Sequence, residues 1–250
     1  MPLKNQVLKD APVIELESID STNNYAMRLI DADTAQEGLT IVASEQTGGK
    51  GQRGRQWVSP PGQNLLMSMI VVPDISLDHQ FIFNAATAVA IADTLQSLYE
   101  HWNVAVKWPN DILINDKKAG GILIENVLRG NTWSYSIIGL GLNVLQAEFP
   151  PELPHAVSLY QISGVRYPLI PLMHEIRNKI LDTLYFQLNP IAILKSYNDF
   201  LYRRNVRQRF TDHKREWEAT VLEVKSDGSL LVLTEQGIAA YQHGHVHWVW

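Results

Sequence analysis

The stretch from Val104 to Val144 constrains the fold more than any other part of the chain. It holds strand-like runs that are separated only by short polar turns. The runs span Val104–Ile114, Lys118–Glu125 and Trp133–Val144. Consecutive strands joined by turns of a few residues pair in antiparallel fashion. The sequence therefore predicts an antiparallel meander.

Patterns on either side of this meander predict the remaining architecture. Strand-like runs precede it at Val13–Ile19, Leu39–Ser44 and Asn64–Val72. Apolar residues at helical spacing predict helices after Asp20–Asn23 and over 78–102, 171–188 and 190–205. Beyond Gln208, closely spaced short strands predict a small β-barrel. We expect an α+β fold: a mixed, mainly antiparallel sheet with flanking helices over residues 1–205, and a small β-barrel domain over 206–250.

The composition is that of a folded soluble protein, with 250 residues of which 46% are apolar and 19% charged. The chain has no cysteine, which excludes disulfides, thiolate catalysis and cysteine-ligated zinc. The first ten residues lack the apolar core of a signal peptide, and no uninterrupted apolar run reaches the length of a membrane span. We expect a cytoplasmic protein with no membrane partner. The net charge of −5 also argues against a nucleic-acid partner.

A glycine-rich basic loop runs from Gln46 to Trp57 and contains four glycines and three cations. Glycines let backbone N–H groups point into a concavity, and lysine and arginine add full positive charge beside them. An indole at the end of the loop offers a flat face to a planar ring. The combination suits an anionic ligand that carries a base. It is not a Walker A loop, because Gly51 follows Gly49-Lys50 where that motif needs serine or threonine. A solvated basic turn is the alternative.

Polar residues interrupt the apolar strands of the meander. They are Lys107, Asn110, Asp111, Lys118 and Asn143. Such groups are costly inside apolar sequence unless they find partners, so they mark either a site or a set of hydrogen-bonded structural groups. Paired glycines at 120–121 indicate close approach of something to the backbone. The polar run 20–23 before a helix is either an ordinary N-cap or a hydrogen-bonding site.

Three histidines alternate near the C-terminus, at His243, His245 and His247. Alternation places side chains on one face of a strand. Because no carboxylate lies beside them, we expect a solvated or packed edge rather than a metal site.

Taken together, the two polar stretches resemble those of the biotin–protein ligases. The matching pieces are Asp20-Ser21-Thr22-Asn23, the loop 46–57, Lys107-Trp108-Pro109-Asn110-Asp111, Lys118-Ala119-Gly120-Gly121-Ile122-Leu123 and Gly139-Leu140-Gly141-Leu142-Asn143. They cover about residues 13–145, and the C-terminal segment resembles the small SH3-like domain of that family. The resemblance implies a class II synthetase-like catalytic domain. The chain shows no helix-turn-helix ahead of this region, so a repressor role is not expected.

The resemblance implies a two-step reaction. Biotin's carboxylate attacks the α-phosphate of ATP and gives biotinyl-5′-AMP and pyrophosphate. A lysine on a biotin-carrier domain, usually that of acetyl-CoA carboxylase, then attacks the intermediate and releases AMP. Biotin, ATP and the carrier domain are thus the implied partners. Whether exposed strands support a homodimer is left open by the sequence.

The resemblance also implies roles for individual residues. Catalytic roles fall to Lys118, Lys107 and Arg55. The biotin site would comprise Ser21, Thr22, Asn23, Gln46, Lys50, Gly51, Gln52, Lys118, Gly120 and Gly121. The nucleotide site would comprise Arg53, Arg55, Trp57, Asn110 and Asn143. Asp111, with Asn110, would hold Mg²⁺ on the phosphates, because hard oxygen ligands suit that ion.

The loop departs from the resembled family at two positions. That family has Gly-Arg-Gly-Arg where this chain has Gly49-Lys50-Gly51-Gln52. Lys50 keeps the charge without the forked geometry, and Gln52 loses the charge. A lipoate ligase-like enzyme and a non-catalytic biotin- or nucleotide-binding module are the competing hypotheses. Titration with biotin and with lipoate distinguishes a biotin ligase from a lipoate ligase-like enzyme. Ligand binding without pyrophosphate release would identify a non-catalytic binding module.

Overall fold

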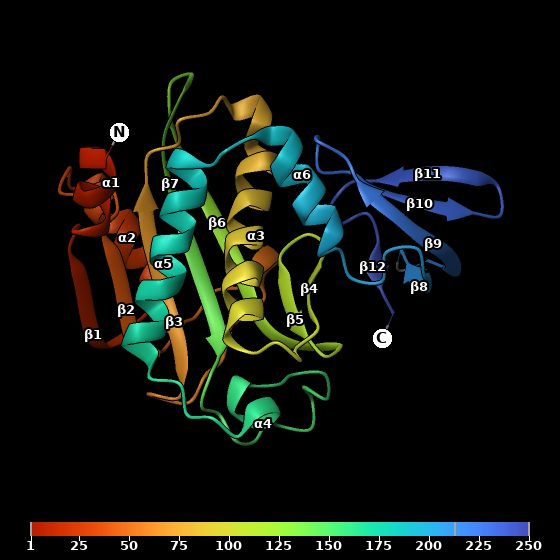
Figure 1. Cartoon of the computed structure of the whole chain (residues 1–250), viewed down its shortest axis with the longest axis horizontal. Coiled ribbons are helices and arrows are strands. Elements are labelled where there is room, and N and C mark those ends of the chain that lie inside the picture. The colour runs from red at the N-terminus through yellow and green to blue at the C-terminus, as the bar shows by residue number, and fades with distance from the viewer. Residues whose placement is uncertain (1, 213, 250) are drawn as a thin grey trace.

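A seven-stranded sheet organises most of the chain in this computed structural model, which describes residues 2–212 and 214–249 (Figure 1). Its strands are β1 (Val13–Ile19), β2 (Thr40–Gln46), β3 (Asn64–Val71), β4 (Val104–Lys107), β5 (Asp111–Ile114), β6 (Lys117–Arg129) and β7 (Thr132–Asn143). Their order across the sheet is β1-β2-β3-β7-β6-β5-β4. Only β1 and β2 are parallel, because α2 carries the chain between them. The predicted mixed, mainly antiparallel sheet and its meander are confirmed.

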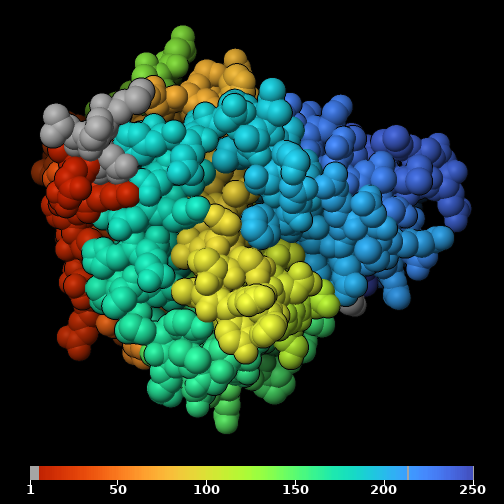
Figure 2. Space-filling model, viewed as in Figure 1, coloured from red at the N-terminus to blue at the C-terminus, as the bar shows by residue number. Residues whose placement is uncertain are grey.

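Helices cover both faces of this sheet. They are α1 (Pro2–Lys9), α2 (Thr22–Asp31), α3 (Gln80–Leu98), α4 (Leu159–Ser163), α5 (Leu169–Phe186) and α6 (Pro190–Asp199), with single 3₁₀ turns at Gln52–Gly54 and Leu77–His79. One face packs against α3 and α5, which lie side by side across it (Figure 1). In Figure 2 the side chains of α5 and α6 form much of the surface on this side, beside the C-terminal strands. The other face packs against α2 in a smaller apolar cluster.

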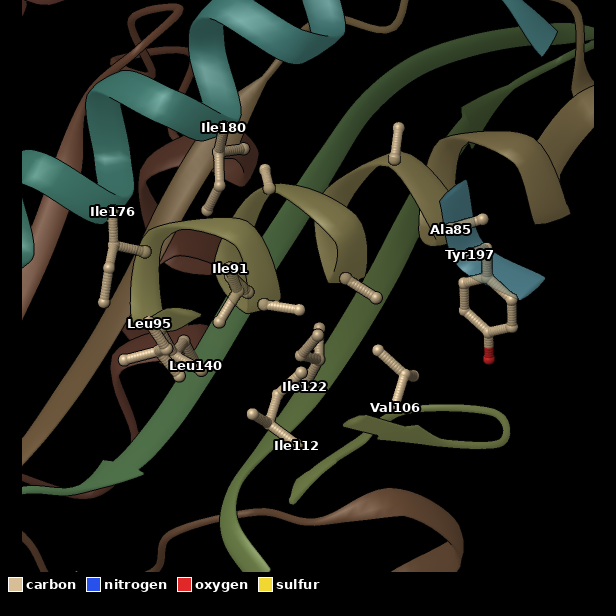
Figure 3. Packing of buried hydrophobic residues seen from close by; sticks show 14 of the residues in the cluster. Ala85, Ile91, Leu95, Val106, Ile112, Ile122, Leu140, Ile176, Ile180 and Tyr197 are labelled. Atoms are coloured by element: carbon tan, nitrogen blue, oxygen red, sulfur yellow. The ribbon is translucent and has the colours of Figure 1, made fainter. Parts of the chain in front are cut away.

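Strand alternation decides which side chains face which helices. On β3, Leu65, Met67 and Met69 belong to the large core beneath α3 and α5, whereas Ile70 packs with α2. Figure 3 shows Ile91 and Leu95 of α3 packed over Ile112, Ile122 and Leu140 of the sheet. On β7 the large-core residues alternate with Gly139 and Gly141, which have no side chain to place on the α2 side. The sheet is therefore filled on one face and open around these glycines on the other.

The central helix has an unexpected property. By length and composition alone the segment Leu77–Leu98 could cross a membrane. The expectation that no apolar run reaches the length of a membrane span did not predict this, because Gln80, Asn84 and Asp93 interrupt the apolar run. In the fold most of this segment is buried, so its apolar surface packs within the protein core.

A second, five-stranded antiparallel sheet follows α6 (Figure 1). It comprises β8 (Arg207–Thr211), β9 (Glu216–Val224), β10 (Leu230–Thr234), β11 (Gly237–Tyr241) and β12 (His247–Trp248), in the order β11-β10-β9-β8-β12. This agrees with the small C-terminal β-domain that the sequence predicts. The Trp108 indole N–H donates to the Gly228 carbonyl at 3.0 Å, which ties this sheet to the meander. The predicted boundary between residues 205 and 206 stays a prediction.

Two local expectations were wrong. Helix α6 ends at Asp199 rather than near 205, because the chain then turns through Arg203 and Asn205 in left-handed conformations. The three C-terminal histidines do not share a strand face. Gly244 takes a φ of 85°, so His243 to Val246 form a tight turn and β12 begins only at His247.

Arg177 of α5 is fully buried and forms hydrogen bonds with backbone carbonyls from the N-terminal part of the chain. Its guanidinium donates to the carbonyls of Leu8, Lys9, Ala11 and Gly38 and to the Thr40 hydroxyl, at 2.7–3.1 Å. Burial lowers the pKa of this guanidinium. A single side chain therefore joins α1, the start of β2 and α5.

Replacing Arg177 by methionine should destabilise the fold by at least about 3 kcal/mol, since several buried carbonyls would lose their donor at once. Urea unfolding measures the change. The matched control is Arg129→Met, because Arg129 forms an exposed ion pair with Asp33 and should cost less than about 1 kcal/mol. Equal losses in both variants would contradict a special role for Arg177.

Candidate functional site

A cavity of about 650 Å³ opens on the α2 side of the sheet. Its walls come from the start of α2, the loop 46–57, the β4–β5 turn, β6, β7 and the C-terminal segment 243–248. We call this the main cavity and the loop 46–57 the lid. The volume lies within the usual range for small-molecule sites.

One end of the main cavity is a network of amides and hydroxyls. The Gln46 side-chain oxygen accepts hydrogen bonds from the backbone N–H of Thr22 at 2.8 Å and from its hydroxyl at 3.0 Å. The Ser68 hydroxyl lies 2.7 Å from the Thr22 hydroxyl and 2.5 Å from Asn23 Oδ1. Asn23 in turn donates to Glu125 Oε2 at 2.7 Å. These groups are held in fixed orientations, as recognition of a polar ring requires.

The position of Ser21 bears on whether the polar run 20–23 is an ordinary helix N-cap or part of a binding site. It takes the N-cap position of α2 with an extended backbone, yet its side chain makes no capping hydrogen bond within the described part of the chain. The side chain is almost fully buried and lines the main cavity. Its position therefore fits the site better than an ordinary cap.

Glycines form the floor of the main cavity. A Cβ on Gly141 would collide with the Trp57 indole, and one on Gly139 would collide with the Asn23 amide. A Cβ on Gly121 would lie 3.2 Å from Trp57 Cζ3. The lid tryptophan can lie flat on β6 and β7 only because these positions have no side chain.

The lid is a short hairpin that reaches the C-terminal sheet. Gly51 donates to the Arg55 carbonyl at 2.7 Å, and Trp57 donates to that of Gly49 at 3.0 Å. Arg53 sits at its tip with a φ of 55°, and its guanidinium donates to the His243 carbonyl at 2.6 Å. The lid thus bridges the two sheets.

Two lysines share one carboxylate in the main cavity. Lys118 Nζ lies 2.7 Å from Asp111 Oδ1, and Lys107 Nζ lies 3.9 Å from Asp111 Oδ2. Lys118 Nζ also lies 5.7 Å from the centre of the Trp57 ring, within the range of a cation–π contact. Burial lowers the pKa of Lys107 to about 8, with Asp111 opposing the shift and Lys118 and Arg55 adding to it.

Positive charge dominates the main cavity although the chain as a whole is acidic. Among the described residues that line it, five are lysine or arginine and one is a carboxylate. The cations are Lys50, Arg53, Arg55, Lys107 and Lys118, and the carboxylate is Asp111. An excess of positive charge in a partly closed space attracts anions. The arrangement suits a ligand with phosphate or carboxylate groups and a planar ring.

The structure brings most of the predicted site residues together and leaves two outside. All line the main cavity except Gly120 and Asn143. The missing Cβ of Gly120 faces the Gly141 carbonyl and Ile112 instead. Asn143 is buried and donates to the Val157 carbonyl at 3.1 Å. Both residues lie next to the cavity wall rather than in it.

Several residues at the site were missed by sequence reasoning. Ser68 is the one hydroxyl within an otherwise apolar β3 after Asn64, and that contrast was an available signal. Glu125, at the end of the predicted strand, pairs with Asn23 and lies 3.8 Å from Lys50. His243, His247 and Trp248 line the cavity because the C-terminal sheet folds against the lid. No local pattern could have indicated that contact.

The residues present offer a partial site for a divalent metal. No cluster of three histidine, cysteine or acidic side chains occurs among residues 2–212 and 214–249. Asp111 supplies one carboxylate. The Asn110 side-chain NH₂ group donates to the Ile122 carbonyl, and this hydrogen bond does not use the Asn110 side-chain oxygen. Mg²⁺ is commonly held by one or two carboxylates together with phosphate oxygens. The donor set fits an ion that arrives with a phosphate ligand.

Comparison with known proteins identifies relatives of the whole chain. The model of the biotin/lipoate A/B protein ligase family matches residues 15–143. The bifunctional ligase/repressor BirA of Bacillus spizizenii is 32% identical over 243 residues, which cover 94% of this chain and 73% of that protein.

Solved structures show the same fold. A biotin protein ligase from Aquifex aeolicus, in complex with biotin and ATP, has a TM-score of 0.78 at 24% identity and covers 95% of this chain and 98% of its own. One from Leishmania major, in complex with biotinyl-5-AMP, has a TM-score of 0.65 at 25% identity, with 92% and 98% covered. The family match spans more than half of the chain, and the BirA relative extends the similarity over both sheets. The chain belongs to the biotin/lipoate A/B protein ligase family.

Proposed function

We propose that this chain is an ATP-dependent biotin–protein ligase, which attaches biotin to a lysine of a biotin-carrier domain through biotinyl-5′-AMP. One observation carries the proposal: Lys118 and the cationic lid enclose the same cavity, whose far end is a preformed hydrogen-bonding network. Relatives named biotin–acetyl-CoA-carboxylase ligases support this enzyme class. The carrier domain of acetyl-CoA carboxylase is the proposed acceptor, in the cytoplasm.

The amide and hydroxyl network is the proposed site of the ureido ring of biotin. Gln46, Thr22 and Asn23 are held by one another and by Ser68. A ring with both donors and acceptors can join such a network without leaving a buried group unpaired. The carboxylate of biotin would then lie toward Lys118.

The first step joins two anions. The biotin carboxylate attacks the α-phosphorus of ATP, a P–O bond forms, and the bond to the β-phosphate breaks to release pyrophosphate. Lys118, held by Asp111, orients the carboxylate, while Lys107 and Arg55 hold the phosphates. Fixed cations reduce the repulsion between the reactants and stabilise the charge that builds on phosphorus. Asp111 and Asn110 would hold Mg²⁺, which supplies further charge neutralisation when it is bound with the phosphates.

The lid has two proposed tasks. The first is stacking of Trp57 on the adenine. The Trp57 indole lines the main cavity beside the cations that would hold the phosphates of the same nucleotide. The closed hairpin also keeps water away from the mixed anhydride, which would otherwise hydrolyse.

Labelling of a purified carrier domain, dependent on both biotin and ATP, tests the whole proposal. Labelling by lipoate in place of biotin would contradict it.

Lys118→Ala should lower biotin-dependent ATP–pyrophosphate exchange by roughly 100- to 1,000-fold, the loss typical when one preorganised charge-stabilising donor is removed. Circular dichroism should show an unchanged fold. Lys117→Ala is the matched control, because Lys117 is an exposed neighbour outside the main cavity. Exchange at the wild-type rate in Lys118→Ala would refute the assigned role.

ATP binding should weaken as the pH rises above about 8. Below that value Lys107 is protonated and attracts phosphate, and above it the ammonium loses its proton, since burial lowers its pKa to about 8. Calorimetric titration should show affinity falling by up to about tenfold per pH unit between pH 8 and 9.5. In Lys107→Arg the charge persists, so the affinity should stay level over the same range. A decline of the same size in both proteins would exclude Lys107 as its source.

Gln52→Arg should slow the release of biotinyl-AMP. The Gln52 side-chain oxygen is buried and has no hydrogen-bond partner within the described residues, and the side chain lines the main cavity. A guanidinium there adds a charge-assisted bond of about 1.5–3 kcal/mol, which corresponds to at least roughly tenfold slower release. Gln36→Arg, at an exposed position that does not line the main cavity, is the control. Stopped-flow release at an unchanged rate in Gln52→Arg would contradict the expectation.

A further inference from the structure

A second cavity of about 370 Å³ adjoins the main cavity. We call it the side cavity. It lies where the lid, the start of α3 and the β9–β10 turn meet. Asp78, just before α3, and Phe81, in its first turn, line one side. Ser226 and Asp227 of the β9–β10 turn also line it. Five residues line both cavities, namely Gln52, Pro109, Asn110, Ile122 and His243. The two spaces therefore share a wall at the centre of the site.

The two cavities have opposite electrostatic character. The side cavity has carboxylates at Asp78 and Asp227, both exposed at its mouth, and no lysine or arginine among the described residues that line it. Two acceptors in its mixed lining are unsatisfied, since the Asn84 and Gln52 side-chain oxygens are buried and have no hydrogen-bond partner among the described residues. Carboxylates at a mouth and unpaired acceptor oxygens inside suit a cationic hydrogen-bond donor.

The second step of the reaction needs such a donor to enter. An acceptor lysine arrives as an ammonium ion, because its pKa is about 10.4. The main cavity repels it, because five cations and one carboxylate line that cavity. Glu125, which pairs with Lys50 at 3.8 Å, and the single phosphate of biotinyl-AMP do not cancel this excess of positive charge. Approach through the main cavity is thus electrostatically unfavourable, whereas approach through the side cavity is favourable.

From this complementarity we infer that the side cavity is the entry route for the acceptor lysine, and that Asp78 and Asp227 attract its ammonium group. The inference rests on the proposed function. The residues on the shared wall are uncharged or weakly basic. Gln52 and Asn110 are neutral, and burial lowers the pKa of the His243 imidazole, so it adds little positive charge at neutral pH.

The chemistry at the end of this route is amide formation. The ammonium gives up one proton to solvent before it reaches the anhydride. The free amine then attacks the carbonyl carbon of the mixed anhydride, a C–N bond forms, and the C–O bond to phosphate breaks with its electron pair leaving on AMP. The second amine proton passes to a phosphate oxygen of the departing AMP. Asp78 and Asp227 act before this step, as positioning residues for the incoming cation.

The experiment uses the full chain with biotin, ATP and the biotin-carrier domain of acetyl-CoA carboxylase. The variant is the double substitution Asp78→Asn with Asp227→Asn, which keeps side-chain size. Asp74→Asn is the matched control, because Asp74 is an exposed carboxylate close to Asp78 in sequence that does not line the side cavity. Single-turnover transfer from preformed biotinyl-AMP is measured with two nucleophiles, the carrier domain and hydroxylamine, which is uncharged at neutral pH.

We expect the double variant to transfer biotin to subsaturating carrier domain about three- to tenfold more slowly at low salt, the size expected for two exposed charge contacts. The deficit should shrink as salt screens the attraction. Transfer to hydroxylamine and ATP–pyrophosphate exchange should match the control. Ser226→Trp, which narrows the mouth, should likewise slow transfer to the carrier domain and spare hydroxylamine.

Carrier-domain transfer at the control rate in both the double variant and Ser226→Trp would overturn the entry route while leaving the ligase function intact. Equal slowing with both nucleophiles would also overturn it, because a general defect in the site would then explain the loss. Absence of carrier labelling by the wild-type protein would instead refute the proposed function and the route together.

Discussion

The function of this fold depends on a concentration of positive charge around the main cavity, which the surrounding strands and the lid must hold in place. Five cations surround the main cavity, and a single carboxylate, Asp111, pairs with two of them. Like charges in a partly buried space repel and are costly to desolvate, as the lowered pKa of Lys107 shows. Asp111 offsets part of that cost. The remainder is an energetic preference for an anion, which is what a nucleotide and a carboxylate together provide.

The meander explains how the two lysines and the carboxylate come together. β4 and β5 pair so that Lys107 lies opposite Asp111, and β5 pairs with β6 so that Asp111 lies opposite Gly121, three residues from Lys118. A register shift between Ile112 and Leu113 then brings Lys118 toward the same end of the strands. Strand pairing, rather than a flexible loop, thus sets the Lys118–Asp111 contact. Groups built on strands are held more rigidly than groups on loops, which favours charge stabilisation during reaction.

The meander and most residues of the main cavity could be predicted from the sequence, because the patterns that indicate them lie within short segments. Short turns predicted the meander, and the glycine-rich lid and the Lys107–Asp111 run indicated an anion site before any coordinates. The pairing of Asp111 with Lys118 was not predicted, because it depends on which strands are neighbours. Asn143 shows the same limit: its polar character marked it as special, yet tertiary packing directs its amide to the Val157 carbonyl. The His243–His247 run misled because one glycine with positive φ replaced a strand by a turn.

The C-terminal sheet is the part whose contribution no local pattern could reveal, and its position gives it a direct influence on the lid. Arg53 contacts the His243 carbonyl across 190 residues of sequence, while Trp108 of the meander contacts Gly228 of the same sheet. Both contacts end in backbone carbonyls, so they depend on the path of the chain rather than on the identity of a partner side chain. The lid therefore closes against the backbone of the second sheet, and any displacement of that sheet must alter the enclosure of the main cavity. In this arrangement the small sheet is one wall of the site, and the charge on the lid is held in place from outside the catalytic sheet.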